Sequence, residues 1–146
     1  MINKTYVCIF YVLAAEALAL PLLNPYLQKN ASFSHGVNFA VAGSTSLSKS
    51  VLLQNRIVQP ATNSSLSVQF NWFKNHLQTL CSFKTECAHI LKNALFMVGE
   101  IGGNDFNYAF LQRKTLDEAR SLVPHVVHQV VDIADVSISN HLVKLT

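Results

Sequence analysis

An apolar run that breaks into a polar, glycine-rich stretch constrains the fold of this chain more than any other feature. Leu95 to Val98 are apolar at every position, and the next seven residues hold Gly99, Gly102, Gly103, Asn104 and Asp105. Such a run predicts a strand with both faces buried, as in the centre of a parallel sheet. Since functional sites in open α/β sheets lie where strands end, this polar stretch is a candidate site.

A second strand is predicted upstream of the first. Val37, Phe39 and Val41 alternate with Asn38 and small residues, so the pattern predicts a short strand over 37–42. The strand ends at Gly43, and a loop rich in serine and threonine follows. If the two strands are neighbours, their polar ends lie close together.

Helices are predicted on either side of these strands. The range 66–80 carries apolar residues at helical spacing behind a Ser64 or Ser65 cap, and Thr115 with Glu118 forms a capping-box pattern. The other expected elements are helices over 12–19 and 85–94, a helix from Thr115 through Ile133 that Pro124 either kinks or starts, and a loop over 49–63. This order of elements predicts the α/β class with parallel strands.

Composition narrows the functional classes. The chain has 146 residues, of which 50% are hydrophobic and 13% charged, with a net charge of +3, as expected of one folded domain. Lysine and arginine are scattered, so no nucleic-acid partner is expected. Cys81 and Cys87 are six positions apart; they could close a small disulfide loop or remain two buried thiols. No second pair of ligands stands at zinc spacing, so no metal is expected.

The N-terminus allows two interpretations. One early lysine followed by an apolar run from Tyr6 to Ala15 is typical of a signal peptide, and a small-residue cleavage pattern follows at 17–19. The alternative is a helix of the folded domain that ends before Pro21. A stable membrane span is not expected, because Glu16 would lie in mid-membrane.

Three chemistries could use the Gly-Gly-Asn-Asp stretch. A phosphate cradle is disfavoured because the glycine spacing does not fit G-x-G-x-x-G and no Lys-Ser/Thr follows. An oxyanion hole requires fixed N–H donors, which the Gly43 backbone and the Asn104 amide could supply. From spacing alone, an ordinary turn is the better explanation of either residue.

Two longer blocks carry a family resemblance. "GVNFAVAGSTSL" and "LFMVGEIGGNDFNYAF" resemble the second and third conserved blocks of plant GDSL esterase/lipases, of the SGNH hydrolase superfamily, and "EALALPLLNPYL", "SLSVQFNWFK" and "RSLVPHVV" are similar to the sequence between and around them. The resemblance implies a partial flavodoxin-like α/β/α sandwich over 12–146, with 1–11 outside the family or signal-like. It also implies secretion, no cofactor, and a small-molecule or lipid ester substrate.

The resemblance implies roles for single residues. Carboxylic esters are hydrolysed by a serine nucleophile with a histidine base oriented by aspartate, and the oxyanion hole would use the Gly43 N–H and the Asn104 side chain. Gly102, Gly103 and Asp105 would shape the turn that aims Asn104.

The chain departs from the family pattern at the nucleophile and the base. The sequence contains neither Gly-Asp-Ser nor Asp-x-x-His, and the central first strand that would carry the nucleophile is expected to be missing. Other serines and histidines are poor substitutes on sequence grounds: Ser44, Ser46, His125, His128, and the pair Asp135 and His141. We therefore expect a member of this esterase family that retains the oxyanion-hole half alone and is inactive by itself. The alternative is a catalytically inactive truncated fragment or a non-catalytic interaction module.

Overall fold

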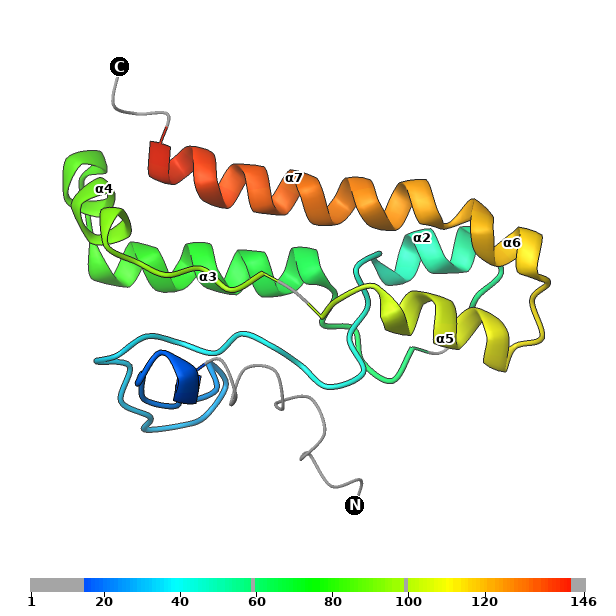
Figure 1. Ribbon diagram of the computed structural model, residues 1–146, viewed down its shortest axis with the longest axis horizontal. Helices are drawn as coiled ribbons and strands as arrows, with labels where there is room; N and C mark the ends of the chain where they lie inside the picture. Colours follow the sequence, from blue (N-terminus) through cyan, green and yellow to red (C-terminus); the bar gives the residue numbers. More distant parts are fainter. Residues whose placement is uncertain (1–14, 59, 99, 143–146) are drawn as a thin grey trace. The chain divides into compact units, whose positions relative to one another are not determined.

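The structure is a computed structural model that describes residues 15–58, 60–98 and 100–142, with side chains described as far as residue 135. The chain divides into two compact units, Met1–Ala42 and Gly43–Thr146. Figure 1 traces both units along the sequence.

The first unit has little regular structure. Residues 15–17 are helical, and Ala19, at φ 52°, ends that turn as the Leu20 N–H bonds the Ala15 carbonyl at 2.8 Å. Of the predicted helix over 12–19, residues 18 and 19 form a turn instead, and 12–14 lie outside the described residues. The boundary predicted between residues 11 and 12 lies there too.

The predicted strand over 37–42 was wrong as a strand. Among the described residues, its only ladder contact is an isolated parallel bridge between Pro25 and Asn38. The Asn38 side chain accepts the Ala40 N–H at 2.9 Å, a local bond that takes this donor away from any sheet partner. The side chain of Asn38 thus forms a local hydrogen bond where the predicted strand would need a bond to a neighbouring strand.

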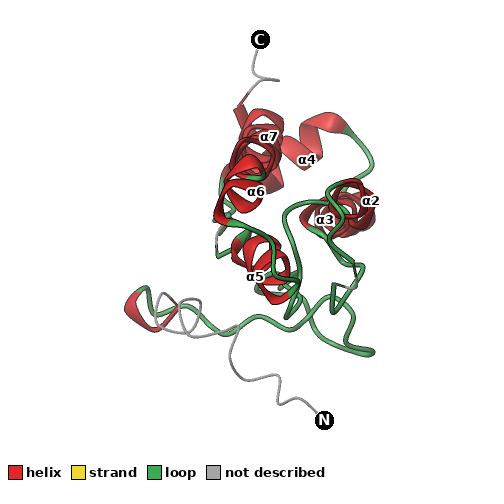
Figure 2. Cartoon of the chain, turned by 90° about the vertical axis from the view of Figure 1, so that its right-hand side faces the viewer, coloured by secondary structure: helices red, strands yellow, loops and turns green. Residues whose placement is uncertain are grey.

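The second unit is built from helices. They are α2 (Lys49–Gln54), α3 (Leu66–Leu80), α4 (Lys84–Lys92), α5 (Gly103–Leu111), α6 (Leu116–Ser121) and α7 (Val123–Leu142). The long helix α7 contacts α3, α4 and α6, and Figure 1 shows it running alongside α3. Figure 2 shows helices and loops, and no strand in the part of the chain that the structure describes.

Two of the helix predictions are confirmed closely. Helix α3 spans the predicted range, with Ser65 at its N-cap position. Helix α6 begins with the predicted capping box, in which the Thr115 side chain accepts the Glu118 N–H and the Glu118 carboxylate accepts the Thr115 N–H. The single helix predicted beyond Thr115 is two helices, because Pro124 lies in the first turn of α7, where it needs no N–H partner.

The strand predicted over 95–98 was also wrong. These residues are extended but belong to no ladder, and in the described ranges the backbone of Leu95, Met97 and Val98 makes no hydrogen bond. A strand exists only through its neighbours, and the described residues supply none here. The α/β class and the flavodoxin-like sandwich are therefore not observed in the described ranges, which are helical.

Two helices were missed. Helix α2 falls in the range predicted as loop, and α5 begins at the glycine-rich stretch predicted as a turn. Both take part in the core of the second unit. That core is a cluster of buried apolar side chains from the 43–47 loop, α2, α5 and the α6–α7 region: Leu47, Leu52, Ile57, Ala109, Leu122 and Val126.

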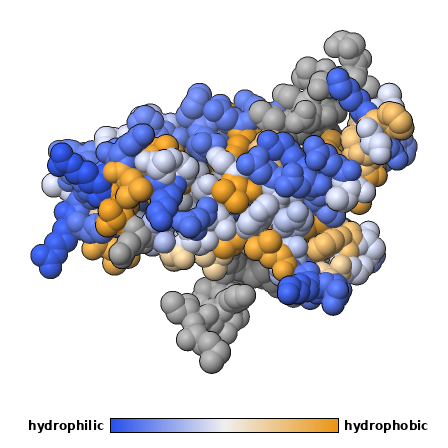
Figure 3. Space-filling model, turned by 180° about the vertical axis from the view of Figure 1, so that it is seen from behind, coloured by the Kyte–Doolittle hydropathy of each residue, from blue (hydrophilic) through white to orange (hydrophobic). Residues whose placement is uncertain are grey.

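Much apolar surface stays outside this core. Leu95 is 63% exposed, Met97 53% and Leu111 78%. On the face drawn in Figure 3, apolar patches lie among hydrophilic side chains instead of forming one continuous surface. Burial of apolar area is the main stabilising contribution to folding, so the chain leaves a sizeable part of that contribution unused.

Candidate functional site

Helix α5 starts at a backbone geometry that only glycine tolerates well. Gly102 occupies its N-cap position at φ 102°, in the left-handed region. A Cβ atom at Gly102 would lie 2.8 Å from Cγ1 of Val126. Both facts exclude larger residues here, so the glycine lets α5 begin immediately beside α7.

Three side chains of α5 hold the loop 43–47. The Tyr108 hydroxyl donates to the Gly43 carbonyl at 2.9 Å, and the Asn104 amide donates to the Ser44 carbonyl at 2.9 Å. The Asp105 carboxylate accepts the N–H groups of the next two peptide units, from Ser46 at 2.8 Å and from Leu47 at 2.9 Å. The four peptide units between residues 43 and 47 are thus each fixed by one bond from this helix.

Asp105 is the centre of this clamp. Its side chain is fully buried, at 0% exposure, and its two oxygens each accept one loop N–H. Burial raises the pKa of Asp105, and hydrogen bonds from the backbone N–H groups of Leu47, Ser46 and Asp105 itself oppose that rise. A carboxyl whose oxygens are both occupied in this way is suited to hold the loop.

Gly43 also has little room for a side chain. It has φ 77°, and a Cβ atom there would lie 3.1 Å from Cβ of Ala61 and 3.2 Å from the Tyr108 hydroxyl. That hydroxyl also accepts the Ala61 N–H at 3.1 Å. Tyr108 therefore fixes the Gly43 carbonyl and the backbone that faces it.

Two hydrogen-bond donors of the clamp remain unused. In the described ranges the Gly43 N–H has no acceptor, and one of the two N–H groups of the Asn104 amide has none. Asn104, Asn107, Tyr108, Phe110 and Leu111 line an adjacent open cavity of about 480 Å³. The structure thus brings the predicted Gly43 loop and Asn104 together and places a cavity beside Asn104.

The side chains that the sequence analysis judged poor substitutes are not assembled into a nucleophile and base in the described ranges. Ser44 and Ser46 are buried, at 4% and 0% exposure, and the Ser46 hydroxyl donates to the Val126 carbonyl at 3.4 Å. On α7, His125 is exposed and His128 pairs with Asp132 at 3.1 Å. Asp135 is exposed, and the side chain of His141 lies outside the described residues.

Sequence reasoning missed Tyr108. The signal was present, because Asn104 and Tyr108 are four residues apart and Asp105 lies next to Asn104, so all three reach one side of a helix. That spacing has meaning only once 103–111 is known to be a helix.

Elsewhere in the second unit, Cys81 and Cys87 are joined by a disulfide, with Cα atoms 5.2 Å apart. Over the ranges that the structure describes, no cluster of three or more His, Cys, Asp or Glu side chains could hold a metal ion. In the same ranges, each helix is too short or too polar to cross a membrane.

Comparison with known proteins gives a consistent set of relatives. The chain is 52% identical over 118 residues to acetylajmalan esterase of Rauvolfia serpentina and 48% identical over 117 residues to a GDSL esterase/lipase of Arabidopsis thaliana. This chain is a homologue of the plant GDSL esterases/lipases. Sinapine esterase of Brassica napus is a further relative, 44% identical over 120 residues.

These alignments cover most of this chain and a minor part of each relative. They span 80% to 81% of the chain but 30% to 31% of the relatives, so the chain spans about a third of their length. No family model matches the chain, and no solved structure does.

Proposed function

We propose that the loop 43–47 and helix α5 form the oxyanion-hole half of a GDSL-type carboxylic-ester hydrolase. The Gly43 N–H and the free N–H of Asn104 would donate to the oxygen that becomes negative when a serine attacks the ester carbonyl. The observation that carries this proposal is the clamp, since Asn104, Asp105 and Tyr108 all bond the loop that contains Gly43.

Rigidity is the physical reason why a clamp supports this role. An oxyanion hole accelerates acyl transfer because its donors are already oriented and need no reorganisation as charge develops. Asp105 and Tyr108 fix the peptide units on either side of the one that Asn104 holds. Gly102 and Gly103 then act by letting α5 start where its first side chains reach the loop.

The substrate that we propose is a small-molecule or lipid ester. Two relatives, acetylajmalan esterase and sinapine esterase, carry names that refer to esters of small molecules. The cavity beside Asn104 has apolar side chains from Phe110 and Leu111 and amides from Asn104 and Asn107. An ester places an apolar chain next to a carbonyl, which matches this mixture of groups.

We expect no working nucleophile and base among the described residues of this chain. Neither Ser44 nor Ser46 has a histidine partner in the described ranges, and the sequence contains no Gly-Asp-Ser or Asp-x-x-His. This observation favours a second candidate, in which the chain by itself does not turn over esters and acts as a non-catalytic interaction module.

One pair of experiments separates the candidates. The chain alone is assayed with p-nitrophenyl acetate and butyrate, and so is a hybrid in which it replaces the homologous segment of acetylajmalan esterase. We expect no turnover from the chain and measurable turnover from the hybrid. Turnover by the chain that Asn104→Ala abolishes would instead show that it holds its own nucleophile.

The hybrid then tests the oxyanion role directly. Asn104→Ala should lower kcat by about 10²-fold to 10³-fold with a small change in KM, because the lost bond is strongest in the transition state. Asn107→Ala is the matched control, since this amide lines the same cavity and bonds no loop residue. A hybrid whose kcat survives Asn104→Ala would refute the proposed role.

We also propose that the protein works in an oxidising compartment and is secreted. The disulfide between Cys81 and Cys87 supports this, because such bonds persist mainly outside the cytosol. Non-reducing and reducing mass spectrometry of protein from the native tissue would test it, and two free thiols would contradict it.

A further inference from the structure

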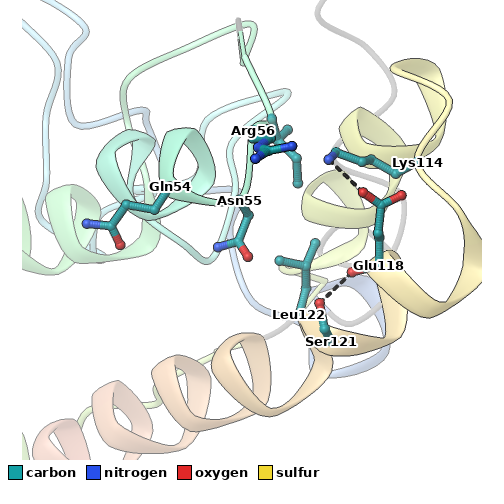
Figure 4. A pocket seen from close by; sticks show the side chains of 8 residues that line it. Gln54, Asn55, Arg56, Lys114, Glu118, Ser121 and Leu122 are labelled. Atoms are coloured by element: carbon teal, nitrogen blue, oxygen red, sulfur yellow. Dashed lines mark hydrogen bonds and ion pairs between the residues drawn. The ribbon is translucent and has the colours of Figure 1, made fainter.

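A second cavity lies in the same unit, with a charge balance that the ester chemistry does not use. It has a volume of about 200 Å³ and opens between the C-terminal end of α2 and the start of α6. Figure 4 shows its lining: Gln54, Asn55, Arg56, Ile57, Lys114, Glu118, Ser121 and Leu122. The buried side chains of Ile57 and Leu122 form its apolar part.

Two cations and one carboxylate line this cavity. Arg56 and Lys114 supply the positive charges, and Figure 4 shows their charged groups pointing toward one another. The carboxylate of Glu118 is already committed, since it accepts Lys114 at 2.9 Å and both the N–H and the hydroxyl of Thr115. One positive charge therefore remains without a counter-charge inside the cavity.

That remaining charge is on Arg56. Over the described ranges its guanidinium has no acidic partner, whereas Arg120, on α6, pairs with Asp117 at 3.5 Å. The Lys114 side chain is only 16% exposed and uses one of its three N–H donors on Glu118. The cavity thus offers a free planar fork from Arg56 and further donors from Lys114.

Helix ends explain part of this arrangement. Arg56 follows the end of α2 and Lys114 follows the end of α5, and a cation is favourable near a helix C-terminus. This effect accounts for a cation at each end, but not for both cations lining one cavity. Arg113 shows the difference, because it follows α5 in the same left-handed conformation as Arg56, at φ 59° and 57°, yet lies outside the cavity.

We propose that this cavity binds a small oxyanion, a carboxylate or phosphate group, between Arg56 and Lys114. Arginine binds such groups through two parallel N–H bonds, and an ammonium adds a point charge. The volume accommodates one such group with a few waters, since a water molecule occupies about 30 Å³ in the liquid. The inference is independent of the ester hydrolysis proposed above.

The test uses the full 146-residue chain and two probe anions. Inorganic phosphate and sodium acetate are titrated separately into ¹⁵N-labelled protein, with sodium chloride at matched ionic strength as the reference. We expect saturable shifts of the 54–57 and 114–122 amide signals with millimolar affinity for at least one probe. If phosphate alone binds, the site is specific for a phosphate group; if acetate binds as well, it recognises carboxylates.

A matched pair of variants makes the test specific. Arg56→Asn removes the fork, and asparagine accepts the left-handed backbone without strain; Arg113→Asn makes the same change outside the cavity. We expect Arg56→Asn to weaken binding about fivefold or more and Arg113→Asn to leave it unchanged. Equal losses in both variants would mean a general charge effect and would overturn the proposal, as would the absence of saturable shifts in the unmodified chain.

A second cavity variant guards against misfolding. If Arg56→Asn loses its native amide spectrum, Lys114→Gln replaces it, since this change keeps most of the side-chain volume and removes the other cation. Binding that survives Lys114→Gln at full affinity would also overturn the proposal.

Discussion

Asparagine in place of Asp105 tests the clamp at its most buried side chain. The variant keeps the shape of the side chain, but one oxygen becomes an NH₂ group that must face either the Ser46 or the Leu47 N–H, now bonded at 2.8 and 2.9 Å. One charge-assisted bond is lost and one buried donor is left unpaired. Each effect costs about 1–3 kcal/mol, so together they should lower the free energy of unfolding of Asp105→Asn by about 2–6 kcal/mol before any offset.

The burial of Asp105 offsets part of this loss. Burial raises the pKa of this carboxyl, so the ionised form costs some stability at neutral pH, and the neutral variant recovers that part. The sign follows from linkage. The stabilising contribution of a raised pKa is complete below the unfolded value of about 3.8 and is lost as pH rises through the folded value. Asp105→Asn should remove this part of the pH dependence.

Urea unfolding followed by circular dichroism at several pH values measures both effects. Asp132→Asn is the control, because Asp132 lies on α7 with its side chain 52% exposed and should change stability by less than about 0.5 kcal/mol. The reasoning is refuted if Asp105→Asn is as stable as the unmodified chain at pH 7. It is also refuted if both variants lose the same amount, since the clamp would then have no special weight.

Two further changes test the start of α5 and the cap of α6. Gly102→Ala should destabilise the fold by about 1–3 kcal/mol, because its Cβ would lie 2.8 Å from Val126 and its φ is 102°. In Gly103→Ala the new Cβ meets nothing within 4 Å, so this control should be neutral or slightly stabilising. Thermal melting of the two variants tests the difference. Hydrogen bonds from Lys114 and Thr115 lower the pKa of Glu118 from 4.5 to about 2, so its stabilising contribution is present above pH 4.5 and is lost as pH falls toward 2. Glu118→Gln should flatten stability over that interval, and an unchanged acid profile would contradict the capping role.

The helices that could be predicted are those with a long apolar period or a complete cap. Helix α3 has fifteen residues, enough for its apolar face to repeat, and α6 has both partners of its capping box. Helix α2 has six residues, too few for a period, and its cap is a single bond from the Val51 N–H to the Ser48 hydroxyl at 3.4 Å. Short helices of this kind are decided by packing, here the burial of Leu52, and not by local sequence.

The two strand predictions were wrong for a different reason. Periodicity reports which faces of a segment are apolar, but it does not report whether a partner strand is there to pair with it. The run 95–98 is apolar on both faces as a central strand should be, yet Leu95 and Met97 are largely exposed. The prediction was thus correct about the character of the segment and wrong about its state, because pairing depends on residues elsewhere.

The glycine-rich stretch that was predicted as a turn is the start of a helix, and the turn prediction concealed how the site is built. Two glycines and an asparagine lower helix propensity, which favours the turn. In the structure Gly102 is the N-cap, so Asn104, Asp105 and Tyr108 fall on one helix and reach successive peptides of the 43–47 loop. A turn could have aimed Asn104 alone. A helix aims three side chains together, so the position of Asn104 depends on the same rigid element that holds Gly43, and Tyr108 belongs to the site as much as the two residues that the sequence indicated.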